Sequence, residues 1–220
     1  MHIPVMQETV LEYLAPRPGG VYLDATAGML GHAGAIAARL STGMVIACDR
    51  DADSLEIARR HAAEFAGRIR LERAAFSELP AVLARVGVSK VDGLVADLGA
   101  SLYQLTDAGR GFSFLSDGAL DMRMDRSQRR TADEIVNTTA EKALADLIYE
   151  FGQERRARKI ARAIVRARPI TSTLHLARVV ERAAPRTGRL HPATQTFMAL
   201  RIAVNGEMEE LDALLKLAPD

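Results

Sequence analysis

The sequence predicts an α/β fold in which an incomplete parallel sheet is followed by a block of helices. Up to about residue 105, short apolar runs alternate with helical patterns, which is the β-α-β rhythm of a parallel sheet. From about residue 106 the strand patterns stop, and apolar residues recur at helical spacing. The 220 residues are 48% hydrophobic and 26% charged, which is typical of a globular protein and excludes collagen-like and disordered chains.

The elements follow from these patterns in chain order. Strands are expected at 21–25, 44–48, 69–73 and 91–97, with helices at 7–14, 31–40, 52–65 and 77–86. After a long polar loop at 106–130, helices are expected at 131–137, 140–151, 153–168, 173–184 and 191–215. We therefore expect a sheet domain at 1–105, a helical insertion at 106–205, and a helix at 206–220 that returns to the sheet domain.

Cysteine content and hydropathy favour a cytoplasmic protein. Cys48 is the single cysteine, so it can form neither an internal disulfide nor a thiolate cage for a metal. No apolar run approaches the roughly 18 to 20 residues of a membrane span, and the N-terminus has no signal-peptide pattern. We expect no membrane contact and no metal site.

The first candidate site follows the first strand. The pattern of residues 21–31 predicts a buried strand that ends near Asp24, followed by a turn with Gly28 and Gly31 at the start of a helix. Asp49 ends the second strand, 21 residues after Gly28, where a carboxylate binds a ribose in dinucleotide-type folds. The loop lacks the G-x-G-x-x-G spacing of a nicotinamide dinucleotide site, so S-adenosylmethionine is favoured, although a turn without a ligand stays open. Asp24 would help to order the loop around the ammonium group of that cofactor.

A second group of polar residues follows the fourth strand. Asp97, Ser101 and Gln104 should lie beside the same pocket, because ligands bind beyond the carboxyl ends of parallel strands. Turn chemistry explains Asp97, but it leaves the Ser101/Gln104 pair unexplained. Phe76, after the third strand, fits either a contact for an adenine ring or a core position.

Positive charge is concentrated in the second half of the chain. Residues 153–189 hold 11 basic side chains and two acids, and most of the basic ones are arginines. Arginine binds phosphate through two parallel hydrogen bonds and stacks on bases, which suits RNA. A solvated helix face is an equally good interpretation of the charge alone.

Longer motifs resemble a known family. They include Asp24-Ala25-Thr26-x-Gly28, Gly31-His32, Asp49-Arg50-Asp51, Arg110-Gly111-Phe112-Ser113-Phe114, Leu120-Asp121-Met122-Arg123-Met124-Asp125, and the run His191–Asn205. With these motifs, nearly the whole chain resembles the bacterial ribosomal small-subunit RNA methyltransferase H family, also called MraW.

The resemblance implies a class I, S-adenosylmethionine-dependent methyltransferase that modifies N4 of a cytosine in the decoding region of 16S rRNA in the small ribosomal subunit. It implies a Rossmann-like domain with a helical insertion. It also implies that the cofactor contacts Leu30, Gly31, His32, Asp49, Phe76, Asp97 and Gln104.

The chemistry of the implied reaction points to Asp97 as the catalytic residue. A cytosine amino group is a weak nucleophile, and an acceptor for its hydrogens would strengthen it. Ser101, Arg110, Phe112, Phe114 and Arg123 are candidates to hold the RNA, with a packed loop as the alternative. Oligomeric state is not readable from the residues, and a homodimer stays open.

The family pattern continues beyond Asp220 with three further strands, so we expect a C-terminally truncated sequence. Strand 91–97 would then be an exposed edge of the sheet. The alternative function is a non-catalytic RNA-binding or assembly protein on the same fold.

Overall fold

The chain forms two compact units in a computed structural model that describes residues 4–65, 67–186 and 189–218. The sheet unit comprises Met1–Gly99 and Glu209–Asp220, and the helical unit comprises Ala100–Met208. These divisions lie at 99/100 and 208/209, whereas the sequence predicts domain limits at 105/106 and 205/206. Each unit is described by itself.

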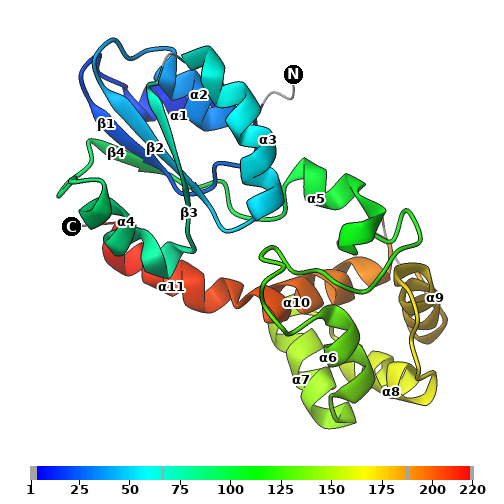
Figure 1. Cartoon of the computed structure of the whole chain (residues 1–220). Helices are drawn as coiled ribbons and strands as arrows, with labels where there is room; N and C mark the ends of the chain where they lie inside the picture. The colour runs from blue at the N-terminus through cyan, green and yellow to red at the C-terminus, as the bar shows by residue number, and fades with distance from the viewer. Residues whose placement is uncertain (1–3, 66, 187–188, 219–220) are drawn as a thin grey trace. The chain divides into compact units, whose positions relative to one another are not determined.

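The sheet unit is built on four parallel strands in the order β3-β2-β1-β4. The strands are β1 (Val21–Asp24), β2 (Met44–Asp49), β3 (Ile69–Arg73) and β4 (Gly93–Val95), and β1 pairs with β2 from Val21↔Met44 to Asp24↔Ala47. The helices are α1 (Gln7–Leu14), α2 (Gly31–Ala37), α3 (Ala52–Ala62), α4 (Leu79–Arg85) and α11 (Glu207–Leu217), with short 3₁₀ turns η1 (Ala63–Phe65) and η2 (Phe76–Glu78) (Figure 1).

Alternation along the strands makes this unit a three-layer structure. Tyr22 and Val45 face a core shared with α1, α2 and α3, whereas Leu23 and Ile46 face a second core shared with α4 and with Leu214 of α11. Successive residues of a strand point to opposite faces, so both faces need apolar cover. The α/β fold class is confirmed: the sheet unit is a Rossmann-like sheet with four strands in place.

The helical unit contains α5 (Leu102–Thr106), α6 (Ala132–Thr138), α7 (Glu141–Gly152), α8 (Ala157–Arg166), α9 (Thr173–Ala183), α10 (Ala193–Asn205) and the turn η3 (Ala108–Arg110). Its core is one apolar cluster in which α7 packs against α8 and α10. Gly152 permits the close approach of α7 and α10, because a Cβ there would lie 2.6 Å from the backbone oxygen of Gln195.

Several expected elements differ from the structure. The helix expected at 191–215 is two helices, because Gly206 adopts φ 58° and ends α10. The strand expected at 91–97 contains only Gly93–Val95, and the helix expected from 153 begins at Ala157. Helix α5 was not predicted, since five residues are too few to show a helical period.

Candidate active site at the strand ends

The end of β1 carries a buried carboxylate that organises the following turn. Asp24 is 1% exposed, and its Oδ1 accepts hydrogen bonds from the Thr26 N–H (3.0 Å) and the Thr26 hydroxyl (3.3 Å). The Thr26 Oγ1 in turn accepts a hydrogen bond from the Asp97 N–H at 2.7 Å. Thr26 therefore connects the end of β1 to the residue that follows β4.

Asp49 fixes the glycine turn from the neighbouring strand. Its Oδ2 accepts a hydrogen bond from the Gly28 N–H at 2.9 Å, and its Oδ1 accepts one from the Asp51 N–H at 2.9 Å. Burial raises the pKa of Asp49, and these two N–H groups oppose the rise. A carboxylate oxygen has two lone pairs, so both oxygens keep capacity for a further donor such as a ribose hydroxyl.

The turn reaches α2 through backbone conformations that are unusual for side-chain-bearing residues. Gly28 has φ 47°, and the buried Leu30 has φ 70°. A leucine in the left-handed region costs of order 1–3 kcal/mol and persists only where its surroundings impose it. The strain lies where the sequence predicts cofactor contacts at Leu30 and Gly31.

Two buried polar atoms beside this turn have no hydrogen-bond partner of normal geometry in the described part of the chain. They are Oδ2 of Asp24 and Nδ1 of His32. Burial raises the pKa of Asp24 to about 6, and burial also lowers the pKa of His32, against the opposing effect of the Asp97 carboxylate. Orphaned polar atoms are costly in a core, so their presence at one turn indicates a place for a polar ligand.

Asp97 and Phe76 follow the carboxyl ends of β4 and β3, which are the two outer strands of the sheet. The Asp97 side chain is exposed, and no hydrogen bond to its carboxylate is found among the described residues. Phe76 starts η2 directly after β3 and is half-buried against the core that contains Leu79. Ser77 is held by Glu210 of α11, whose carboxylate accepts hydrogen bonds from the Ser77 N–H (2.9 Å) and hydroxyl (3.0 Å).

The Ser101/Gln104 pair has a structural explanation in the helical unit. The Ser101 hydroxyl accepts a hydrogen bond from the Gln104 N–H (3.2 Å), and the Gln104 side chain accepts one from the Ser101 N–H (2.9 Å). This is a capping box at the start of α5. Turn chemistry therefore accounts for the pairing, and a cofactor contact by Gln104 stays a prediction.

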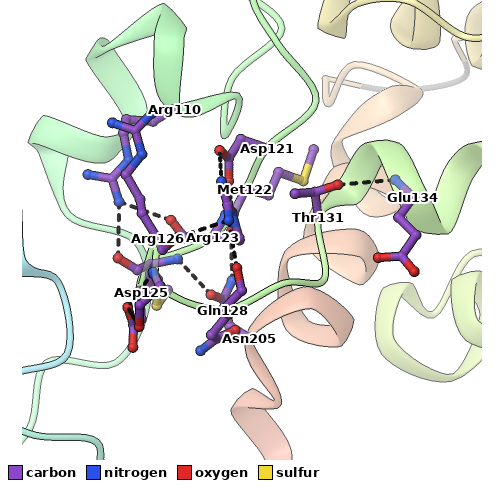
Figure 2. Close-up of polar contacts among 12 residues, drawn as sticks. Arg110, Asp121, Met122, Arg123, Asp125, Arg126, Gln128, Thr131, Glu134 and Asn205 are labelled. Atoms are coloured by element: carbon purple, nitrogen blue, oxygen red, sulfur yellow. Dashed lines mark hydrogen bonds and ion pairs between the residues drawn. The ribbon is translucent and has the colours of Figure 1, made fainter.

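The candidate RNA residues Arg110 and Arg123 hold the long loop together (Figure 2). Arg110 is 1% exposed, and its guanidinium donates hydrogen bonds to the carbonyls of Arg123 (2.9 Å) and Met124 (3.1 Å). Arg123 forms a two-pronged pair with Asp121, which raises the pKa of Arg123, and it also donates to the Gln128 carbonyl. Both side chains therefore position the loop. A direct contact of either guanidinium with RNA would have to be made in addition to these hydrogen bonds or in place of them.

Asn205, which the sequence interpretation did not single out, is the other anchor of this loop. Its Oδ1 accepts a hydrogen bond from the Met124 N–H (2.7 Å), and its Nδ2 donates to the Met122 carbonyl (2.8 Å). The residue is 3% exposed and ends α10. One indication of this role was present in the sequence, since Asn205 is the last residue of the long His191–Asn205 motif.

The two candidate phenylalanines differ in accessibility. Phe112 is buried, with the Arg110 guanidinium 5.9 Å from its ring centroid. Phe114 is half-buried and packs on the rings of His191 (centroids 4.7 Å apart) and Phe197 (4.9 Å). Phe114 and His191 therefore provide the more accessible aromatic surface.

Two negative findings apply to the described residues. They contain no group of three or more His, Cys, Asp or Glu side chains placed to hold a metal ion. Among the same residues, no helix combines the length and apolar character that crossing a bilayer requires.

The sheet unit belongs to the Rossmann-like class of cofactor-binding α/β folds. Its strand order, the acids at the ends of β1 and β2, and the glycine turn between β1 and α2 are typical of that class. The family model described as the MraW methylase family matches residues 1–220, so the chain belongs to that family.

Two curated relatives agree with this assignment, and a solved structure was also found in the comparison. The chain is 63% identical to the ribosomal RNA small subunit methyltransferase H of Solibacter usitatus, covering 100% of this chain and 77% of the relative. It is 48% identical to the protein of the same name from Koribacter versatilis, covering 99% and 72%. The crystal structure of TrmN from Thermus thermophilus is 31% identical over 46% of this chain and 30% of its own, with a TM-score of 0.39.

Removal of the Thr26 hydroxyl tests the connection between β1 and β4. Thr26→Val keeps the shape but removes the acceptor of the Asp97 N–H and one donor to Asp24, so the free energy of unfolding should fall by about 1–2 kcal/mol. Thr26→Ser keeps both hydrogen bonds and serves as the control in urea denaturation. Equal stability of the two variants would contradict the connection.

The raised pKa of Asp24 predicts a pH-dependent stability. Its pKa is about 6 in the folded chain and about 3.9 in the unfolded chain. Its stabilising contribution is therefore complete below about pH 4 and lost as the pH rises through about 6, a change of about 2–3 kcal/mol.

Asp24→Asn does not titrate in this range. Measured by urea denaturation, the stability of the parent relative to this variant should fall between pH 4.5 and pH 7.5. Asp146→Asn, at an exposed position on α7, is the control and should show no such trend. A parent-to-variant difference that stays constant with pH would show that Asp24 is ionised throughout.

Proposed function

We propose that the protein uses S-adenosylmethionine to methylate N4 of a cytosine in the decoding region of 16S rRNA. The observation that carries the proposal is the turn of residues 26–32, where Asp49 fixes the backbone and Asp24 and His32 present buried polar atoms without partners. Membership of the MraW methylase family supports methyl transfer. The names of the relatives support ribosomal RNA of the small subunit as the substrate.

The residues at the turn fit this cofactor. Leu30, Gly31 and His32 would hold its methionine part, and the buried Asp24 carboxylate suits a positively charged ammonium group because opposite charges attract strongly where water is excluded. Asp49 would accept hydrogen bonds from the ribose, and Phe76 would pack beside the adenine. S-adenosylmethionine supplies a methyl group on a positively charged sulfur. Gln104 belongs to the helical unit, and its contact with the cofactor stays a prediction.

Asp97 is proposed to act on the cytosine. Its carboxylate would accept a hydrogen bond from the exocyclic amino group, which draws the nitrogen lone pair out of conjugation with the ring and orients it for attack. The backbone N–H of Asp97 donates a hydrogen bond to Thr26, which holds the main chain from which the carboxylate extends. A base in a stack cannot reach such a site, so the cytosine must be flipped out.

Holding the RNA is proposed to be the task of the helical unit. Phe114 and His191 offer an aromatic surface on which a base can stack. Arg110 and Arg123 keep the adjacent loop in shape. We propose that the protein is soluble and cytoplasmic and that it acts on the small ribosomal subunit.

The Asp97→Asn variant tests the proposal. The 220-residue chain is incubated with 16S rRNA or small ribosomal subunits and S-adenosylmethionine labelled in the methyl group, and the nucleosides are then separated. We expect label in N4-methylcytidine, and we expect the variant to lower kcat by about 100-fold or more, the usual contribution of a proton acceptor. Asp212→Asn, on the exposed surface of α11, is the control.

Two results would contradict the proposal. Label in another nucleoside would overturn the N4 assignment, and near-normal kcat of Asp97→Asn would remove Asp97 from the chemistry. Retention of RNA by the parent chain with no methyl transfer would support the non-catalytic alternative.

A further inference from the structure

Helix α8 carries a stripe of basic side chains on its outer face. Ala157, Ile160, Ala161 and Ile164 point into the core of the helical unit. The exposed side chains form the α8 stripe, defined as Arg155, Arg158, Lys159, Arg162 and Arg166. At 100° per residue, the four stripe residues within the helix occupy a single arc opposite the buried residues.

The other two arginines of this segment have structural tasks and do not belong to the stripe. Arg156 pairs with Glu154 and donates a hydrogen bond to the Pro185 carbonyl at 3.0 Å. Arg168 donates to the carbonyls of Val136 (2.8 Å) and Thr139 (2.5 Å). The structure thus separates arginines that bind backbone carbonyls of the fold from arginines with exposed side chains, which the sequence could not do.

The stripe is poorly neutralised by the chain itself. Within residues 4–65, 67–186 and 189–218, Arg162 has an ion pair with Glu141 (Nε to Oε1, 3.3 Å), and no ion pair is found for the other four members. Both partners of that pair are exposed, so it contributes little.

The arrangement is unfavourable for the isolated helix. Arg158, Arg162 and Arg166 repeat at i, i+4, and like charges at that spacing destabilise a helix by about 0.2–0.5 kcal/mol per pair. Arg158 and Lys159 also lie in the first turn, where the helix dipole disfavours cations, and that turn contains neither an acidic residue nor a side-chain cap. The stability of the free chain therefore does not explain the stripe, whereas an anionic partner does.

We propose that the α8 stripe binds the phosphate backbone of the substrate RNA, an inference that rests on the proposed function. Arginines four residues apart lie about 6 Å apart along the axis, so Arg158, Arg162 and Arg166 can contact successive phosphates of one strand. The guanidinium group grips phosphate through paired hydrogen bonds. A membrane surface does not fit, because a helix that lies on a bilayer inserts its apolar face, and the apolar face of α8 is buried in the core.

A triple substitution tests the proposal. Arg158→Gln, Lys159→Gln and Arg166→Gln together remove three unpaired charges and leave Arg162 and its pair with Glu141 in place. The control triple is Arg59→Gln, Arg60→Gln and Lys90→Gln, at exposed positions of the sheet unit, with the same change in net charge. Binding of 16S rRNA is measured by filter retention from 50 to 200 mM salt, alongside thermal unfolding and methyl transfer.

We expect the α8 triple to bind RNA at least about tenfold more weakly at 100 mM salt and to lower the slope of log K against log salt by about 2–3. Its unfolding temperature should stay equal or rise, because repulsion along α8 is relieved. Methyl transfer should show a higher KM for RNA with an unchanged kcat, and the control triple should match the parent.

The failures can be told apart. If the α8 triple has the same RNA affinity and salt slope as the control triple, the stripe proposal is overturned. Methyl transfer by the parent would still support the proposed function in that case. A stripe-dependent affinity without methyl transfer by the parent would overturn the function and keep the RNA surface. No RNA binding by the parent would overturn the stripe proposal outright.

Discussion

The hydrogen bond from the Gly28 N–H to the Asp49 carboxylate is the interaction on which the candidate active site depends. It joins the turn after β1 to the end of β2, and it holds the backbone where Gly28 and Leu30 adopt left-handed conformations. Because the Asp49 carboxylate binds the Gly28 N–H, an acid at the end of β2 has a structural role that does not depend on a ligand. The same carboxylate keeps lone pairs for a ribose, so one residue both shapes the turn and offers a contact to the cofactor.

Both units bury polar side chains that shape a turn or a loop. In the sheet unit, Asp24 and His32 keep buried polar atoms without partners, which is a cost that a ligand would relieve. In the helical unit, Arg110 and Asn205 are buried and bind backbone carbonyls and N–H groups of the long loop, while the buried Oγ1 of Thr196 has no hydrogen-bond partner among the described residues. The sheet unit thus has buried polar atoms at one turn that a small polar ligand could satisfy, whereas the helical unit has a long loop anchored by buried side chains and an exposed basic face on α8.

The sequence predicts the sheet well, because apolar runs separated by helical patterns leave few alternatives to parallel pairing. It predicts the role of single residues less well. Ser101 and Gln104 were interpreted as parts of a pocket, yet their spacing is also that of a capping box, which the structure shows. Arg110 was a candidate for RNA because of its residue type, and type does not reveal that the guanidinium is buried. Helical periodicity continues across Gly206, so the sequence predicts one helix at 191–215 as well as a returning helix from 206, and only the backbone shows that α10 ends there.

Calorimetric titration with S-adenosylmethionine tests the account most directly, because the turn of residues 26–32 is claimed to be its site. The account predicts saturable one-site binding to the chain, and binding at least about tenfold weaker for Asp49→Ala, which loses both the ribose acceptor and the anchor of Gly28. Glu56→Ala, on the exposed face of α3, should bind like the parent. Absence of saturable heat, or equal affinity of the Asp49→Ala variant, would contradict the account.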